Sequence, residues 1–492
     1  MVSDTLSSLI YGFSIALTPE NLILCLAGAT LGTLIGVLPG LGPVAAISIL
    51  LPLTFKLPPA GSIIMLAGIY YGAMYGGSTT SILLNVPGEA ASVITCLDGY
   101  QMARAGRAAS ALAIAAIGSF IAGTFGIIGL TLIAKPLVGL ALRFGPCEYF
   151  ALVLLGLTFV VYVSHGSRIK AFIMCVFGLI LGCVGLDPIT SAQRFTFGIP
   201  YLFEGLGIAQ VAMGLFGIGE VLVNMERIVE PELVRTKIRN LFLTYRDWLE
   251  AKWAILRGSL VGFMLGLLPG GGPVVASFLA YGVEKRFSKS PEKFGSGAVE
   301  GVAAPESANN AAASTSFVPL LVLGIPPNVM LAVLFGAFLV HGIVPGPLLL
   351  KEKPDIFWGV ISSMYIGNVM LLILNLPLIP LWVQILKISP RILYPLILLL
   401  CVIGAYSINN SVFDVYVVCV FGLIGYFLRK LEFEPAPLVL SMVLSKLLDL
   451  NMRQMLIAFQ GDYLTLFRRP ISLTIILVVL ILVISAFKKK RK

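Results

Sequence analysis

A dense group of polar side chains follows Pro305 and leads directly into a charge-free run over residues 307–350. From Glu306 onward it offers a carboxylate, two amides and several hydroxyls, separated by alanines. Such groups are costly beside an apolar segment unless they line a cavity or bind an ion. The alternative is an ordinary helix N-terminus, with Glu306 near the positive end of the dipole. The candidate binding residues here are Glu306, Asn309, Asn310 and Ser314.

A second polar group lies in the first half of the chain, on both sides of a Pro-Gly pair. Hydroxyl and amide oxygens beside unwound carbonyls suit a hard monovalent cation such as Na⁺. A helix that starts after the Pro-Gly pair would point free N–H groups at an anion. Glu89 is a candidate for cation binding or gating. The candidates in this group are Ser78, Thr79, Thr80, Asn85, Pro87, Gly88 and Glu89.

The motif PGxGP occurs twice inside long apolar runs, and Gly32 and Gly262 precede the two copies at the same offset. Proline and glycine cannot continue a helix cheaply, so both copies are predicted helix breaks. A third break is predicted at Pro87 and a fourth at Pro326. Paired breaks of this kind are typical of transporter binding sites. The residues of the repeated motif are Pro39, Gly40, Gly42 and Pro43, then Pro269, Gly270, Gly272 and Pro273.

The four breaks and the polar groups contain no lysine or arginine. A carboxylate bound there would therefore have to be held by helix N-termini, amides, hydroxyls and co-bound cations. No metal site is predicted beyond a monovalent cation, because the seven cysteines form no CxxC pair and His165 and His341 are far apart. An interior hydrogen-bonded role and a proton-linked role are both open for His341.

The elements that carry these residues are membrane helices. Hydrophobic residues make up 58% of the chain and charged residues 12%, and the mean hydropathy is +0.98. Several charge-free runs exceed the roughly 20 residues that cross a bilayer as a helix. We therefore expect an all-α polytopic membrane protein with about 11–13 membrane segments, some of them broken or re-entrant. The net charge of +10 lies largely in short loops and in the tail Lys488–Lys492, which indicates a cytoplasmic C-terminus rather than nucleic-acid binding.

The repeated motif divides the chain into two halves. Only acidic residues precede the first copy, whereas basic loops flank the second. The two copies are therefore predicted to open to opposite sides of the membrane, as an inverted-topology repeat requires. We expect a first repeat half over residues 1–225, a cytoplasmic polar connector over 226–252, and a second half over 253–492 that ends in a membrane helix and the basic tail.

The chain resembles the large membrane subunit of the bacterial tripartite tricarboxylate transporters, the TctA family. The similarity extends from about residue 30 to about residue 475. The matching stretches are GVLPGLGPVAAIS, GAMYGGSTTSILLNVPGEAASVITCLDGYQMARAGRA, GLLPGGG, PEKFGSGAVEGVAAPESANNAA, LGIPPN, HGIVPGPLL, DVYVVCVFGLIGYFLRKLEFEPAPLVL and RRPISL.

The resemblance implies two inverted repeats, a small membrane subunit of about four spans, and a periplasmic binding protein that delivers the carboxylate. It implies transport in the bacterial inner membrane, driven by an ion gradient without ATP; the chain also lacks a P-loop motif. This sequence departs from the family at Pro327, where glycine is usual, and at Ser441, Ser445 and Lys446. Because the loop at Pro327 is stiffer and more apolar, the substrate could be citrate or a smaller or more apolar carboxylate.

These observations favour a secondary-active permease, a symporter of an organic di- or tricarboxylate with Na⁺ or H⁺, which needs no cofactor. A passive channel would instead show facilitation without accumulation. A membrane enzyme using Glu306 or Asp98 would need a paired acid or base at the same depth, and the sequence offers none that is convincing. A sensory or structural subunit with a degenerate site is the remaining alternative.

Overall fold

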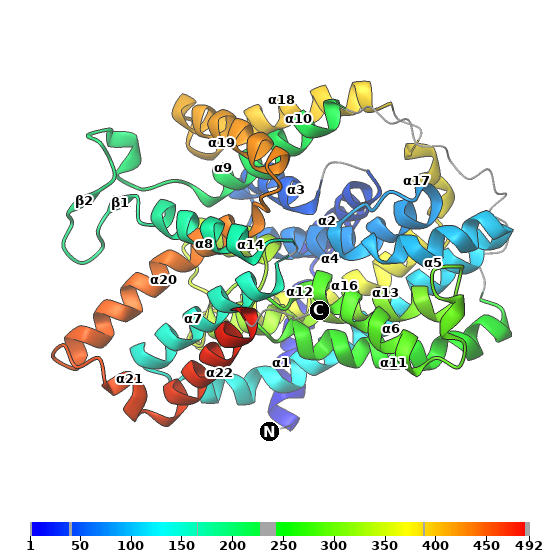
Figure 1. Cartoon of the computed structure of the whole chain (residues 1–492), viewed down its shortest axis with the longest axis horizontal. Coiled ribbons are helices and arrows are strands. Elements are labelled where there is room, and N and C mark those ends of the chain that lie inside the picture. The colour runs from blue at the N-terminus through cyan, green and yellow to red at the C-terminus, as the bar shows by residue number, and fades with distance from the viewer. Residues whose placement is uncertain (1, 39–41, 165, 227–242, 387–388, 488–492) are drawn as a thin grey trace.

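The computed structural model describes residues 2–38, 42–164, 166–226, 243–386 and 389–487 (Figure 1). Within these ranges the regular structure is helical, apart from one antiparallel hairpin of Gly185–Leu186 (β1) with Gln193–Arg194 (β2). The predicted all-α class is confirmed. Several predicted features lie outside the described residues: Pro39 and Gly40 of the first break, most of the polar connector, and the basic tail.

In the first half, several helices begin with a proline, whose missing N–H is not needed in the first turn. The segment between α5 and α6 is kinked at Gly106, whose φ is 80°. The helices are α1 (Val2–Ala16), α2 (Pro19–Val37), α3 (Pro43–Leu50), α4 (Pro59–Leu84), α5 (Thr95–Met102), α6 (Ala108–Ala141), α7 (Pro146–Val163), α8 (Arg168–Gly182), α9 (Ile208–Ala212) and α10 (Gly219–Met225).

In the second half, α13 contains Pro305 in its interior, so Glu306 is not at a helix N-terminus and that alternative is wrong. The helices are α11 (Tyr245–Gly266), α12 (Gly272–Phe287), α13 (Glu300–Thr315), α14 (Val329–Val340), α15 (Leu349–Glu352), α16 (Pro354–Asn375), α17 (Ile379–Ile385), α18 (Pro390–Asn409), α19 (Val412–Lys430), α20 (Ala436–Ala458), α21 (Thr465–Arg468) and α22 (Pro470–Phe487).

Within the described part of the chain, seven helices are long and apolar enough to cross a membrane, and three shorter helices are also apolar. The chain is thus a multi-pass membrane protein; the expected 11–13 segments stay a prediction. The seven are Pro19–Val37, Thr95–Ala141, Pro146–Val163, Ile208–Met225, Pro354–Asn375, Arg391–Asn409 and Val412–Lys430.

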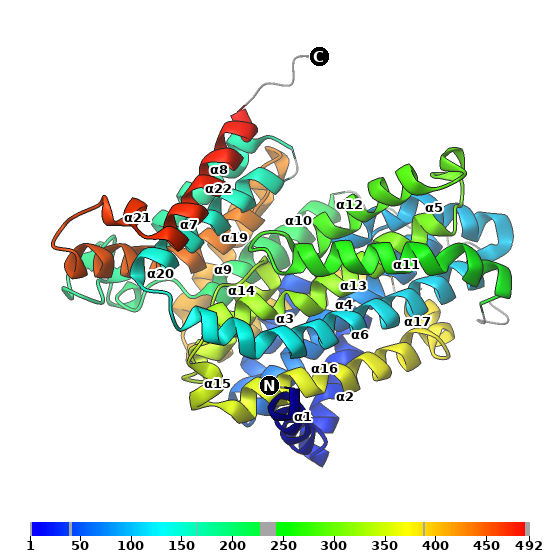
Figure 2. The same cartoon turned by 90° about the horizontal axis from the view of Figure 1, so that it is seen from below.

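The helices gather into two groups that meet at α14. Figure 2 shows α7, α8, α19, α20 and α22 on one side and α4, α6, α11, α13 and α16 on the other. Helix α14 contacts α4 of the second group and α20 of the first. The segment around α14 is therefore well placed to line a site between the two groups.

The repeated sequence has a repeated packing. Three glycines along α2 lie directly against the backbone of α4, and three along α11 lie in the same way against α13. A Cβ added at any of them would lie only 2.2–2.6 Å from a carbonyl oxygen, so these helices touch backbone to backbone. The contacts are Gly28–Met65, Gly32–Ile69 and Gly36–Ala73 in the first half, and Gly258–Ala304, Gly262–Ala308 and Gly266–Ala312 in the second.

These contacts define which residues of the two helices are equivalent. Met65, Ile69 and Ala73 of α4 correspond to Ala304, Ala308 and Ala312 of α13. The two halves therefore contain equivalent helix pairs, as the doubled motif indicates. The opposite membrane orientation of the halves stays a prediction.

Asp98 fixes the loop that leads into α13. Its Oδ1 accepts N–H bonds of 2.8–2.9 Å from Gly295, Gly297 and Ala298, and its Oδ2 accepts the hydroxyl of Tyr281 at 2.8 Å. Both carboxylate oxygens are used in these contacts. The geometry therefore assigns Asp98 a structural task and gives no support to its use as an enzyme's acid or base.

Asp187 organises the β1–β2 hairpin, which lies outside the helices. Burial alone would raise the pKa of Asp187, but N–H bonds from Thr190 and Ile189 and the guanidinium groups of Arg194 and Arg453 outweigh it. Its pKa is therefore held well below the ordinary value. The Arg453 bond, 2.8 Å long, ties the hairpin to α20.

Gly32→Ala should lower the free energy of unfolding by about 1–3 kcal/mol, because the new methyl group would overpack the α2–α4 contact. The added Cβ would lie 2.5 Å from the Ile69 carbonyl oxygen. Thermal unfolding in detergent measures the effect. Gly139→Ala in α6 is the matched control, since its added Cβ would have no neighbour within 4 Å beyond the adjacent backbone of its own helix. Equal stability of the two variants would contradict the backbone contact.

Asp187→Asn should lower thermal stability at neutral pH. The folded-state pKa lies below the unfolded one, so ionised Asp187 stabilises the fold fully above its ordinary pKa of about 3.9. That stabilisation is lost as the pH falls through this value toward the folded-state pKa. Unfolding midpoints of both proteins at pH 7, 5, 4 and 3 should differ by a constant amount down to pH 5 and converge below about pH 4. A difference independent of pH would contradict the role of the charge.

Candidate functional site

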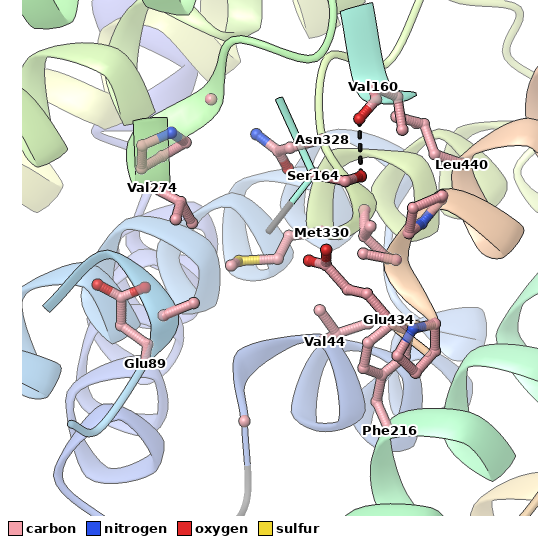
Figure 3. A pocket seen from close by; sticks show the side chains of 18 of the residues that line it. Val44, Glu89, Val160, Ser164, Phe216, Val274, Asn328, Met330, Glu434 and Leu440 are labelled. Atoms are coloured by element: carbon pink, nitrogen blue, oxygen red, sulfur yellow. Dashed lines mark hydrogen bonds between the residues drawn. The ribbon is translucent and has the colours of Figure 1, made fainter. Parts of the chain in front are cut away.

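A cavity of about 650 Å³ lies where the four predicted helix breaks meet (Figure 3). Each break contributes backbone or side chains to its wall, and Val160, Phe216 and Leu440 add apolar surface. In Figure 3, Met330 lies between Glu89 and Glu434. The segments that the breaks contribute are 42–44, 87–90, 270–275 and 327–330.

At two of the four breaks, the helix that begins at this cavity has no side-chain cap. Gly42 precedes α3 and Gly271 precedes α12, and within the described residues neither helix start receives a bond from a capping side chain. Gly42 and Gly272 have φ angles of 47° and 35°, which favour glycine. The first N–H groups of a helix lack partners in the helix itself and attract anions. These two ends are thus suited to hold carboxylate groups.

At each of the other two breaks, a side chain caps the helix that follows, including the one after Pro87 and Gly88. The Glu89 carboxylate accepts the N–H of Ala91 at 2.7 Å, at the start of a 3-10 helix over Ala90–Val93. The Asn328 side chain accepts the N–H of Leu331 at 3.0 Å, at the start of α14. In each case a polar side chain of the break itself satisfies the helix end.

An arginine also reaches the cavity. Arg429, in the last turn of α19, lines it and forms an ion pair with Glu220 of α10. It lies outside the four breaks in sequence, and the sequence pattern did not indicate it. A carboxylate in the cavity would therefore meet a guanidinium group as well as helix N-termini.

A buried polar layer lies behind the cavity, where α4, α5 and α13 meet. Ser78 and Thr95 each donate a hydroxyl bond to one oxygen of the Glu306 carboxylate, which is 1% exposed. Among the described residues, Glu306 forms no ion pair with a basic side chain. Two helices of the first half thus hold a carboxylate of the second.

The two amides next to Glu306 extend this layer. Asn310 Nδ2 donates to Ser119 Oγ at 2.7 Å, which joins α13 to α6. Asn309 Nδ2 donates to Glu89 Oε1 at 3.2 Å. This last bond links the buried layer to the cavity wall.

The remaining candidates lie in different places. Thr80 donates to the Gly77 carbonyl, and Thr79 lines a void of about 10 Å³ beside Ser119. Asn85 is an exposed, left-handed C-cap of α4, with φ 55°. Those that do not line the cavity are Ser78, Thr79, Thr80, Asn85, Pro269, Glu306, Asn309, Asn310, Ser314 and Pro326, whereas Gly42, Pro43, Pro87, Gly88, Glu89, Gly270, Gly272 and Pro273 do.

The tripartite tricarboxylate transporter TctA family matches residues 22–440. The chain belongs to this family. The TctA match includes all four breaks, the buried layer and Arg429.

Two relatives of this TctA chain come from Agrobacterium vitis. One, described as an uncharacterized 52.8 kDa protein in the TAR-I ttuC' 3' region, is 50% identical over 98% of this chain and 96% of its own length. The other, an uncharacterized protein in the TAR-II ttuC' 3' region, is 52% identical over 46% of this chain and 93% of its own length. No solved structure matches the chain.

Membership in the TctA family makes the chain a component of a tripartite tricarboxylate transporter, a system with membrane and binding partners. The binding sites of transporters commonly form where broken helices meet, and the cavity lies at such a place.

Several site residues of this TctA chain could have been found only in three dimensions. Thr95 and Ser119 bond to Glu306 and Asn310 across helix contacts, and Arg429 comes from a distant helix. Asn328, which donates to the Tyr70 hydroxyl at 3.1 Å, could have been found by comparing the two halves of the sequence. Aligning the break after α4 with the break after α13 puts Asn328 opposite Glu89.

Ser78→Ala should destabilise the protein by about 1–3 kcal/mol, because the buried Glu306 carboxylate would lose one of its two hydroxyl donors. Thermal unfolding in detergent measures this. Ser259→Ala is the matched control, since this buried serine of α11 donates only to the Ile255 carbonyl of its own helix. A loss no larger than in the control would show that Ser78 does not support Glu306.

Proposed function

We propose that this chain is the permease subunit of a secondary-active transporter that takes up an organic di- or tricarboxylate, driven by a Na⁺ or H⁺ gradient. A periplasmic binding protein would supply the carboxylate, and a small membrane subunit of about four helices would complete the complex. The complex would lie in the bacterial inner membrane with the C-terminus of this chain in the cytoplasm, in line with the basic tail.

The observation that carries this proposal is the convergence of two uncapped helix starts, at Gly42 and Gly271, on one cavity. Each helix end suits one carboxylate group, and Arg429 supplies a guanidinium group in the same wall. A ligand with two or three carboxylates would satisfy these sites together. A volume of about 650 Å³ lies within the range of small-molecule sites and accommodates such a ligand with water.

Uptake by the complete system tests the proposal. Proteoliposomes would contain this chain with its small membrane subunit, and the binding protein would be added outside with labelled citrate, malate, succinate or propionate. We expect accumulation of a di- or tricarboxylate above the outside concentration when a Na⁺ or a pH gradient is imposed. Equilibration without accumulation would make the chain a passive channel, and no uptake of any probe would overturn the proposal.

Asn309→Ala should reduce this uptake at least tenfold, because Asn309 links the buried layer to the cavity through Glu89. Asn451→Ala is the matched control, since this asparagine of α20 donates to the Leu447 carbonyl of its own helix. Initial rates at equal amounts of reconstituted protein provide the comparison. Wild-type uptake by Asn309→Ala would show that the site is misplaced.

A further inference from the structure

The break after α4 and the break after the π-helical segment Pro319–Leu323, which follows α13, share their backbone conformation at two positions. A left-handed residue ends the helix in each case, Asn85 with φ 55° or Gly324 with φ 70°. Two residues later a proline follows, and then a polar N-cap, Glu89 or Asn328, both with φ −149° and with ψ of 166° and 169°. The glycine contacts that put α4 and α13 in register also pair Glu89 with Asn328.

Both N-caps also reach into the opposite half of the chain. Glu89 Oε1 accepts the amide of Asn309 on α13, and Asn328 Nδ2 donates to the hydroxyl of Tyr70 on α4. Tyr70 and Asn309 are themselves equivalent in the same register. Glu89–Asn309 and Asn328–Tyr70 are thus two matching contacts, each between a residue that lines the cavity and one that does not. They differ in one decisive respect: only Glu89 is a carboxyl group.

Glu89 needs a positive charge or a proton where it lies. Its side chain is buried, and among the described residues it forms no ion pair with a basic side chain. Burial without a counter-charge strongly disfavours an ionised carboxylate. The elements packed against Glu89 and the wall of the cavity carry these titratable or charged groups: Tyr70, Cys96, Tyr281, Glu306, Glu220, Arg429, Glu432 and Glu434. Arg429 is already paired with Glu220.

Asn309 offers a second sign of a missing ligand at this place. Its Oδ1 is completely buried and has no hydrogen-bond partner among the described residues, although its Nδ2 faces Glu89. A buried amide oxygen without a partner is costly. If the amide group of Asn309 rotated by about 180°, its oxygen would face Glu89. There it could accept a hydrogen bond from a protonated Glu89 or coordinate a small cation. The pair therefore has one acidic and one neutral oxygen available for a monovalent cation.

We propose that Glu89 and the amide oxygen of Asn309 bind the coupling cation, a proton or Na⁺, and that Asn328–Tyr70 is the matching contact without a cation. Glu306 is less suited, because it does not line the cavity and hydroxyl groups hold both of its oxygens. This assignment rests on the proposed function.

The position of Glu89 also explains how binding of the cation and of the carboxylate would be coupled. Glu89 lines the same cavity as the uncapped starts of α3 and α12. An ionised Glu89 repels a substrate anion there, whereas a Glu89 that holds a cation does not. Each ligand then raises the affinity for the other by the same factor. Binding of the cation and binding of the carboxylate are then coupled simply because both ligands share one cavity.

The test measures cation binding to the purified full-length chain through its thermal unfolding midpoint. In one arm NaCl replaces choline chloride at pH 8, and in the other the pH is lowered from 8 to 6 without Na⁺. We expect the wild-type midpoint to rise in one arm, which identifies the cation. In Glu89→Gln the apparent Na⁺ affinity should fall at least tenfold, or the rise with acid should disappear. Asn309→Ala should weaken the same response.

Glu432→Gln is the matched control, because Glu432 lines the same cavity but is exposed and pairs with Lys170. It should keep the wild-type response. If Glu89→Gln does not fold, Glu89→Asp keeps the charge on a shorter side chain and should keep the response at lower affinity.

The assignment is overturned if the wild type responds in neither arm, if Glu89→Gln responds like the wild type, or if Glu432→Gln loses the response equally. Carboxylate accumulation by the reconstituted wild type would leave the proposed function standing in each of these cases. Failure of all uptake would instead overturn the proposed function.

Discussion

The backbone N–H and carbonyl groups released at four helix breaks decide where this protein can hold a ligand. In an apolar environment such groups must be bonded by protein, water or ligand. Two breaks satisfy their following helix with a side chain of their own, Glu89 or Asn328. The other two leave the starts of α3 and α12 open toward the cavity. The cavity therefore combines occupied helix ends, which set its shape, with open ones, which suit an anion.

The two halves share a backbone plan but have diverged in chemistry. The glycine contacts of α2 with α4 and of α11 with α13 are the same in kind and in spacing. On this common frame the first half carries Ser78 and Glu89, while the second carries Glu306 and the amides of α13. Polar side chains of one half bond to those of the other across the centre of the protein. The site is therefore completed only when both halves are folded together.

Features that depend on local chemistry could be predicted from the sequence. Charge-free runs predicted the helices, Pro-Gly clusters predicted the breaks, and the cost of burying polar groups pointed to Glu306 and Asn309. Features that depend on distant contacts could not. Arg429 belongs to a helix with no motif that points to the cavity. Asn85 looked like a ligand residue, but its left-handed conformation makes it an exposed helix end. Pro305 suggested a helix start, yet α13 begins at Glu300 and continues through it.

The glycine contacts also limit how this protein can change shape. Where the backbones of α2 and α4 touch, there is no layer of side chains that can repack while one helix slides along the other. We therefore expect α2 and α4 to move together as a rigid body, and likewise α11 and α13. The conformational freedom of a transport cycle would then be concentrated at the breaks, which would act as hinges between rigid bodies. The ligand would sit at the hinges themselves, so that its binding bears directly on the movement.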